Sequence, residues 1–459
     1  FMIERTKTMS KDTTKSMTEG RPFGLILSFA FPVFLGMLFQ QLYSMIDTMI
    51  VGKFLGEDAL GAVGATGSLN FLIIGFCMGV CNGFSIPVAH QFGAKKESNL
   101  RRVVANSIWL CIIFSVIMTI ITVVFCRNIL SFMNTPAELI DDSYKYIVVI
   151  FAGIPVVYLY NMTAGIIRSL GDSKTPVYFL ALASVINIVL DIAFICIFHT
   201  GVEGASYATV ISQAVSGICC LIYMKKKFPI LKISREELSF NKNWALSLCG
   251  MGIPMGLQYS VTAIGSVTLQ TAVNSLGKSY VTAVAAAKKL SIIFCCPYDA
   301  LGTTMATYAG QNIGAGKTER VGPGVKTAFQ IALVYSVFIF IVLNLFSSKL
   351  LLLFVSAEST KIIKDAGLYI LFGSAAYILL SLVNIVRFTI QGLGFGKFAI
   401  LSGFLEMVAR TVASFGLVPF LGYIGVCLAD PLAWLFADCF LIPAYFRCIR
   451  ICKKRLEEA

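Results

Sequence analysis

Charged residues and histidines are scarce in this chain of 459 residues, and their scarcity excludes several classes of protein. Asp, Glu, Lys and Arg make up 13% of the sequence, whereas soluble globular domains carry about 25%. Two histidines, His90 and His199, are present, and neither they nor the cysteines and carboxylates cluster with catalytic or metal-ligand spacing. Segments of about ten residues with alternating polarity, the pattern of a membrane β-barrel, are also missing. We therefore expect neither a soluble domain, nor an enzyme, nor a metalloprotein.

Hydrophobic residues, by contrast, make up 57% of the chain, and its mean hydropathy is +0.82. Apolar runs of the roughly 20 residues that a membrane-spanning helix needs recur from end to end. Reading these runs against the charged breaks predicts twelve spans, at residues 25–52, 60–91, 103–126, 144–167, 176–198, 204–224, 244–273, 280–311, 325–346, 366–388, 398–419 and 425–447. The sequence thus predicts an all-α membrane protein with twelve transmembrane helices.

Fourteen cysteines lie inside the apolar runs without ligand spacing, and we interpret them as small packing residues. The formal net charge of +13 does not indicate nucleic-acid binding, because the basic residues lie in short loops and form no continuous patch. The first 24 residues are polar and lack the short apolar stretch of a secretion signal, so we expect no cleavable signal peptide.

The placement of the basic residues predicts how the chain is oriented. With alternate loops assigned to the two sides, 27 Lys and Arg residues share the side of the N-terminus and 7 lie on the other. The excess of positive charge marks the cytoplasmic side. We expect a multi-pass protein of the bacterial inner membrane with both termini cytoplasmic. Its expected parts are an N-terminal segment (1–24), an N-lobe of six helices (25–224), a basic cytoplasmic linker (225–243), a C-lobe of six helices (244–447) and a tail (448–459).

The two lobes are related in sequence. A shift of 221 residues aligns Leu55-Gly56 with Leu276-Gly277 and Gly93-Ala94 with Gly314-Ala315. A shift of 223 residues aligns further pairs, which are Tyr146 with Tyr369, Asn161 with Asn384, and Leu170-Gly171 with Leu393-Gly394. Because each lobe has an even number of spans, the repeat is parallel, and two such bundles leave a central cleft between them.

Polar residues inside the N-lobe spans point to a cation site. Gln40, Tyr43 and Asp47 form one stripe on the first span, and Asn187 and Asp191 share a face of the fifth. An ionisable group inside hydrocarbon costs about 2.5–3.5 kcal/mol on insertion scales. Two carboxylates at one depth cannot both ionise cheaply, so the pair is suited to bind a proton or a monovalent cation. Bonding to helix neighbours, or for Asp47 a place at the outer interface, is the structural alternative.

The C-lobe carries a second set of charges. Glu406 and Arg410 are spaced i, i+4 on the eleventh span, and we interpret them mainly as a self-neutralising pair. The alternative is a second polar site in the C-lobe, to which Asp299 on the eighth span could belong. Pro32 and Pro254 occupy matching places in the first and seventh spans, where an interior proline permits a bend or a static kink.

Several segments resemble the multidrug and toxic compound extrusion (MATE) family, most closely its DinF- and MepA-like branch. The segment Gln41-Leu-Tyr-Ser-Met-Ile-Asp-Thr-Met-Ile-Val-Gly-Lys53 resembles the first-helix signature, and Gln91-Phe-Gly-Ala94 and Asn312-Ile-Gly-Ala315 resemble repeated helix-end motifs. Arg168-Ser-Leu-Gly-Asp-Ser-Lys-Thr-Pro176 resembles the loop after the fourth helix. The resemblance runs from about Arg21 to Arg450 and implies a V-shaped protein of two six-helix lobes.

The resemblance also implies a function and site residues. Family members export cationic or amphipathic drugs in exchange for H⁺ or Na⁺, which implies small-molecule partners, surrounding lipid, a monomer and no cofactor beyond the coupling ion. Asp47, Asn187 and Asp191 match the cation-coupling positions, with Na⁺ as the alternative ligand, and Pro32 matches a proline proposed to bend the first helix. The expected cavity residues are Gln40, Tyr43, Tyr146, Asn161 and Thr209.

Thr262 stands where the sodium-driven branch of the family has a glutamate, so we favour protons as the coupling ion. Two other transport functions remain open, a lipid-linked sugar flippase of the same superfamily and a channel. The two-lobe repeat with acids near the membrane midplane favours a carrier over a channel.

Overall fold

The computed structural model describes residues 16–133, 135–356 and 358–458, so residues 1–15 of the expected N-terminal segment lie outside the described part of the chain. The described residues form helices and contain no strand. The helices of the first half are α1 (Pro22–Leu55), α2 (Glu57–Gly93), α3 (Glu97–Val124), α4 (Cys126–Phe132), α5 (Ile140–Ala152), α6 (Ile154–Ser169), α7 (Thr175–Ile192), η1 (Ala193–Ile197), α8 (Val202–Lys227) and η2 (Pro229–Leu231). Those of the second half are α9 (Lys242–Ser275), α10 (Lys278–Gly314), η3 (Thr318–Arg320), α11 (Val321–Leu351), α12 (Thr360–Ala375), α13 (Tyr377–Gly392), α14 (Lys397–Val412), η4 (Ala413–Leu417), α15 (Val418–Leu421) and α16 (Tyr423–Glu457).

Nine helices of the described chain are long and apolar enough to cross a membrane, and the bent pairs α5–α6 and α12–α13 bring the number to eleven. The twelfth predicted span is α9, an unbroken helix of 34 residues that is rich in Gly, Ser and Thr and therefore less apolar than the others. At 1.5 Å per residue its length is about 50 Å, more than the roughly 30 Å of a hydrocarbon core. Each predicted span thus corresponds to one helix or one bent helix unit.

The internal repeat predicted from the sequence is confirmed by the turns. Glycines with positive φ lie in matching turns between helices of the two halves: Gly56 and Gly277 (φ 91° and 107°), Gly171 and Gly394 (91° and 93°), and Gly201 and Gly422 (71° and 57°). L-residues with a Cβ rarely adopt this conformation, so the same chain reversal is built into both halves.

Two predicted continuous spans are broken, and again the breaks match. The α5–α6 unit bends by 45° at Gly153 and the α12–α13 unit by 48° at Ala376. Pro155 in the first turn of α6 explains the former, because it lacks an N–H and restricts the residue before it. The second break occupies the same place in the repeat without a proline.

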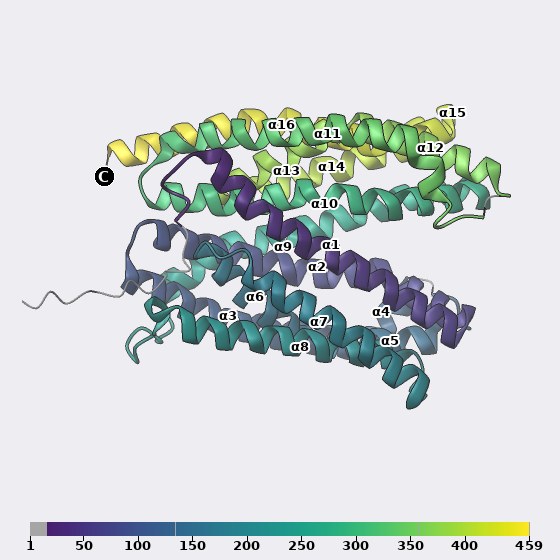
Figure 1. Cartoon of the computed structure of the whole chain (residues 1–459), viewed down its shortest axis with the longest axis horizontal. Coiled ribbons are helices and arrows are strands. Elements are labelled where there is room, and N and C mark those ends of the chain that lie inside the picture. Colours follow the sequence, from purple (N-terminus) through teal and green to yellow (C-terminus); the bar gives the residue numbers. More distant parts are fainter. Residues whose placement is uncertain (1–15, 134, 357, 459) are drawn as a thin grey trace, which may run out of the picture.

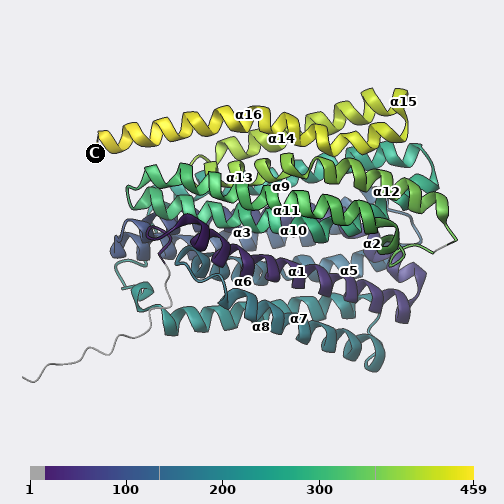
Figure 2. The same ribbon diagram turned by 45° about the horizontal axis from the view of Figure 1, so that its top comes forward.

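The helices form two bundles that lie side by side (Figures 1 and 2). Between the bundles, α2 packs along α9 and α1 packs along α10. Glycines allow the closest approach, because a Cβ on Gly83 would meet the Gly252 Cα at 2.5 Å and one on Gly79 would meet the Gly256 Cα at 2.7 Å. Figure 1 shows the start of α1, the α8–α9 connection and the C-terminus at one end of the molecule, which we call the basic end.

At the basic end the two bundles are joined by a symmetric contact between the last turns of α2 and α10. The His90 Nε2 lies 2.7 Å from the Gly392 carbonyl oxygen, to which it donates, and the matching Gln311 Nε2 donates to the Ser169 carbonyl oxygen at 2.8 Å. Each side chain thus reaches the carboxyl-terminal turn of a helix in the other half. This reciprocal pair closes the cleft between the bundles at the basic end.

The residues before α1 strengthen this closure. The Met17 N–H donates to Gln311 Oε1 at 2.8 Å, and its carbonyl oxygen accepts from Asn312 Nδ2 at 3.2 Å. Arg320 Nη2 donates to the Gly20 carbonyl oxygen at 2.8 Å. The segment that leads into the first helix of the N-lobe is therefore bound to the C-lobe.

The basic linker is also held in place. Arg101 Nε bonds both carboxylate oxygens of Glu237, at 2.9 and 2.8 Å, and the Asn241 N–H donates to Asn106 Oδ1 at 2.8 Å. The hydrogen bonds from Arg101 lower the pKa of Glu237 to about 2. The connection between the lobes is thus tied to α3.

Candidate functional site

A cavity of about 650 Å³ lies between the two bundles and receives side chains from both. Its N-lobe wall is built by α1, α2, α5, α6, α8 and the first turn of α7, and its C-lobe wall by α9, α10, α13, α14 and α16. The contacts of His90 and Gln311 close the cleft at the basic end. The cavity lies further from that end, because its lining on α2 ends at Asn82 and its lining on α10 ends at Thr303.

The polar stripe of α1 faces this cavity. Gln40, Tyr43 and Asp47 all line it, as their i, i+3, i+7 spacing on one helix face requires. Gln213 of α8 lines the same cavity as Tyr43 and Gln40. Asp47 is 8% exposed and lines the cavity, so its carboxyl group sits in the cavity wall.

Asp191 lies behind this wall and is fully buried. Its carboxyl group is within hydrogen-bonding reach of Asp47, so α1 and α7 bring the two predicted acids together. No donor in the described structure bonds Asp47 Oδ1 or either oxygen of Asp191. A hydrogen bond between two carboxyl groups needs a proton on one of them. The geometry is therefore that of an acid pair which can hold one proton.

Asn187 and Thr209 extend the same cluster. Asn187 is 1% exposed, and its Nδ2 points to Thr209 Oγ1 at 3.5 Å, while its Oδ1 has no donor among the described residues. Thr209 reaches the cavity from α8. The cluster thus presents several buried oxygens that no protein donor bonds, an arrangement which also suits a small cation.

A π-helical turn follows the polar residues in each lobe. η1 begins two residues after Asp191, and η4 begins three residues after Arg410. Such turns insert an extra residue, free a backbone group and are frequent at functional sites. The sequence analysis did not foresee them.

The other expected N-lobe residues are placed as follows. Tyr146 and Asn161 line the cavity, and Asn161 Nδ2 donates to the Val157 carbonyl oxygen at 2.9 Å. Pro32 is buried in α1, which continues as one helix beyond it to Leu55. Pro254 likewise lies within the unbroken α9.

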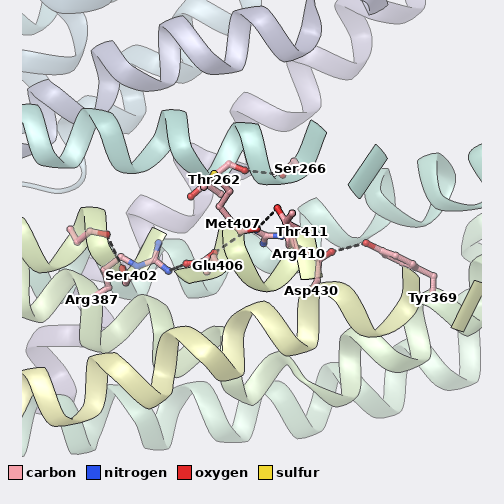
Figure 3. A network of polar contacts seen from close by, with 11 residues as sticks. Thr262, Ser266, Tyr369, Arg387, Ser402, Glu406, Met407, Arg410, Thr411 and Asp430 are labelled. Atoms are coloured by element: carbon pink, nitrogen blue, oxygen red, sulfur yellow. Dashed lines mark hydrogen bonds and ion pairs between the residues drawn. The ribbon is translucent and has the colours of Figure 1, made fainter. Parts of the chain in front are cut away.

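The C-lobe wall holds a chain of ion pairs (Figure 3). Arg387 of α13 donates to Glu406 of α14, and Arg410 Nη1 lies 3.5 Å from the other oxygen of Glu406. Arg410 Nε also bonds Asp430 of α16 at 2.8 Å, and the Tyr369 hydroxyl donates to the second Asp430 oxygen at 2.7 Å. Thr262 of α9 lies across from this network (Figure 3).

The expected Glu406–Arg410 pair is present, with Arg410 Nη1 3.5 Å from Glu406 Oε2, but it is not isolated. Each has a second partner, because α13 and α16 present Arg387 and Asp430 to the same layer of the bundle. Asp299 lines the cavity from α10 and accepts a hydrogen bond from Asn384 Nδ2 at 2.9 Å. It therefore faces the cavity rather than the ion-pair chain.

Several charged residues were missed by the sequence analysis. Arg387, Asp430 and Asp438 lie within apolar spans, which is the signal that identified Asp47 and Asp191. Arg168, quoted above only as part of a loop motif, lines the cavity from the last turn of α6.

A family model for MatE matches this chain twice, at residues 32–193 and 254–416, once in each lobe. The chain belongs to the MatE family. The two matches begin at Pro32 and Pro254, the prolines that occupy equivalent places in the repeat.

Individual MatE relatives and structures agree with this assignment. YoeA of Bacillus subtilis (strain 168), named a probable multidrug resistance protein, is 29% identical over 363 residues, which cover 76% of this chain and 78% of YoeA. YpnP of the same organism, also named a probable multidrug resistance protein, is 32% identical over 308 residues, 66% of this chain and 68% of YpnP. A solved structure, described as the outward-facing conformation of a multidrug resistance MATE family transporter of the MOP superfamily, shares the fold with a TM-score of 0.89 at 23% identity, covering 97% of this chain and 99% of that one. The expected fold of two six-helix lobes is confirmed.

Proposed function

We propose that this MatE protein is a secondary-active multidrug exporter of the bacterial cell membrane, which exchanges cationic or amphipathic compounds for protons. The observation that carries the proposal is the Asp47–Asp191 carboxyl pair in the wall of a cavity of about 650 Å³. The names of YoeA and YpnP support the substrate class. The excess of basic residues at the end where the cleft is closed supports a cytoplasmic position for that end.

The charge of the Asp47–Asp191 pair couples the binding of the proton to the binding of the drug. With one proton shared, the pair carries a single negative charge near the cavity, and a second proton removes it. At an effective dielectric constant of about 20 and a separation of roughly 5 Å, a carboxylate and a drug cation attract each other by about 3 kcal/mol, or ~100-fold in binding. Proton uptake from the outer side therefore releases the drug, and proton loss on the inner side restores its site.

Sodium is the alternative coupling ion, because the cluster offers the oxygens of Asp47, Asn187 and Asp191. We favour the proton because one shared proton is enough to explain why the two carboxyl groups lie within hydrogen-bonding reach of each other. Liposomes that contain the purified protein distinguish the two ions. We expect export of a fluorescent cationic dye with an imposed pH gradient and no sodium, and export that requires a sodium gradient contradicts the proton assignment.

Substitution of the pair tests the site itself. We expect Asp47→Asn and Asp191→Asn each to abolish drug resistance in a hypersensitive host while the protein level stays unchanged. Asp58→Asn is the matched control, since Asp58 is an exposed carboxylate of the N-lobe in the first turn of α2. Full resistance in either the Asp47 or the Asp191 variant would contradict the assignment.

A further inference from the structure

Asp438 is a buried acid that the proposed N-lobe mechanism does not use. It lies in the middle of α16 and is 3% exposed, and neither of its carboxylate oxygens has a hydrogen-bond partner in the described structure. Trp434, one helical turn earlier on the same helix, lines the cavity. Asp438 therefore sits one turn further toward the basic end, just beneath the cavity wall.

The charges that act on Asp438 are those of Arg387 on α13 and Glu406 on α14. Both of these residues line the cavity and bond each other. Arg387 nevertheless has one unused donor, because its Nε is buried and has no acceptor in the described part of the chain. Among the described residues, a buried acceptor without a donor and a buried donor without an acceptor thus lie on two helices of the C-lobe that pack against each other.

Two further groups on helices packed against α16 bond Asp430 and not Asp438. Arg410 of α14 and Tyr369 of α12 bond Asp430, which precedes Asp438 by two helical turns on α16. The neutral Thr262 of α9 lies across from Glu406 (Figure 3). Glu406 and Arg387 therefore set the electrostatic environment of Asp438.

The charge state of this layer follows from its contacts. Arg387 and Glu406 neutralise each other, so an ionised Asp438 would add one uncompensated charge at a buried place without a hydrogen-bond donor. The effective cost of burying a single ion in a protein is several kcal/mol. A proton on Asp438 removes that cost and leaves the Arg387–Glu406 pair intact. When the proton leaves, the unused Nε–H of Arg387 is the group that can donate a hydrogen bond to the new Asp438 carboxylate.

We propose that Asp438 is a second proton-binding carboxyl group, located in the C-lobe, and that its proton decides whether Arg387 bonds Glu406 alone or Asp438 as well. The proton exchanges with the cavity past Arg387 and Glu406. Because the three residues stand on α13, α14 and α16, the exchange of partners changes how these helices pack. Its role in coupling rests on the proposed proton exchange, and each transport cycle then carries two protons, one for each lobe.

Infrared difference spectroscopy of the purified protein tests the proton site without any substrate. Protonated carboxyl groups absorb in a band separate from that of carboxylates, and stepping the pH reveals which bands titrate. We expect the wild-type protein to show a titrating carboxyl band that Asp438→Asn lacks and that Asp438→Glu shifts in position. Asp430→Asn is the matched control on the same helix, because Asp430 is bonded by Arg410 and Tyr369 and should contribute no protonated band.

The band of the proposed Asp47–Asp191 pair is expected in all of these proteins. A set of titrating carboxyl bands that is identical in the wild-type protein, Asp438→Asn and Asp438→Glu overturns the proton site. If the asparagine variant does not fold, the glutamate variant decides, since the position of its band either shifts or does not. The infrared measurement does not depend on drug transport. It can therefore contradict the proton site at Asp438 without contradicting the proposed exporter function, and a transport experiment can contradict the exporter function without contradicting the proton site.

The coupling role is read from transport in liposomes with the membrane potential held at zero. A pH gradient of about one unit supports a maximal dye concentration ratio of about 100-fold with two coupled protons and about 10-fold with one. We expect the ratio to fall about 10-fold in Asp438→Asn, and an unchanged ratio overturns the coupling role.

Discussion

The last turns of α2 and α10 cross so closely that neither helix can carry a side chain at the crossing. A Cβ built on Gly93 would lie 2.1 Å from the Gln311 carbonyl oxygen, and one on Gly314 would lie 2.0 Å from the His90 carbonyl oxygen. Contacts between carbon and oxygen are normally no shorter than about 3.3 Å. Because the clashing atoms belong to the backbone, the helices must move apart by about 1 Å to accept a methyl group.

We therefore expect Gly93→Ala and Gly314→Ala to weaken the closure at the basic end. Overpacking of this kind costs typically about 1–3 kcal/mol, which corresponds to a shift of about 5–150-fold in the ratio of open to closed molecules. The separation also strains the hydrogen bonds that His90 and Gln311 make to the opposite lobe, at 2.7 and 2.8 Å. The fold of each lobe should remain intact.

Amide hydrogen exchange followed by mass spectrometry measures this shift. We expect the last turns of α2 and α10 to exchange faster in both variants, by about the same 5–150-fold factor, and the centres of α3 and α11 to be unchanged. Gly64→Ala is the matched control, since Gly64 lies on the same helix and its Cβ would meet nothing within 4 Å. Unchanged exchange at the crossing, or equal acceleration in the control, would refute the reasoning.

Two further predictions concern stability. Arg387→Met leaves Glu406 with only the more distant Arg410 as a partner in a buried layer, so we expect the free energy of unfolding to fall by up to about 3–5 kcal/mol. A thermal-shift assay should show a lower unfolding temperature, with partial recovery in the double variant Arg387→Met/Glu406→Leu. An unchanged temperature in the single variant contradicts the contribution of the pair. The bonded Arg101 lowers the pKa of Glu237 from 4.5 to about 2, so this contact stabilises the fold above pH 4.5 and loses its effect as the pH falls toward about 2. The difference in linker protease resistance between the wild-type protein and Glu237→Gln should therefore be present at neutral pH and disappear under acid, and a difference that persists at pH 2 contradicts the assignment.

The sequence alone was sufficient for the features that depend on local composition and on the order of residues along the chain. Apolar runs predicted each of the twelve helical units, because burial in hydrocarbon requires about 20 apolar residues whatever their neighbours are. The repeat was visible because the same turns in both halves contain glycine. A positive φ, which residues with a Cβ rarely adopt, explains why glycine is needed at Gly56, Gly171, Gly277 and Gly394. The N-lobe acids were found because a carboxylate within an apolar span is costly in any fold.

Only the tertiary structure decided which polar groups meet. Asp47 lines the cavity whereas Asp191 lies behind it, and this difference depends on the rotation of α7 against α1. The C-lobe chain from Arg387 to Asp430 joins residues of α13, α14 and α16, and the break at Ala376 and the π-helical η4 alter the direction or register of two of these helices. Helical periodicity fixes which residues of one helix share a face, but contacts between helices depend on their packing and bends, which no single segment encodes.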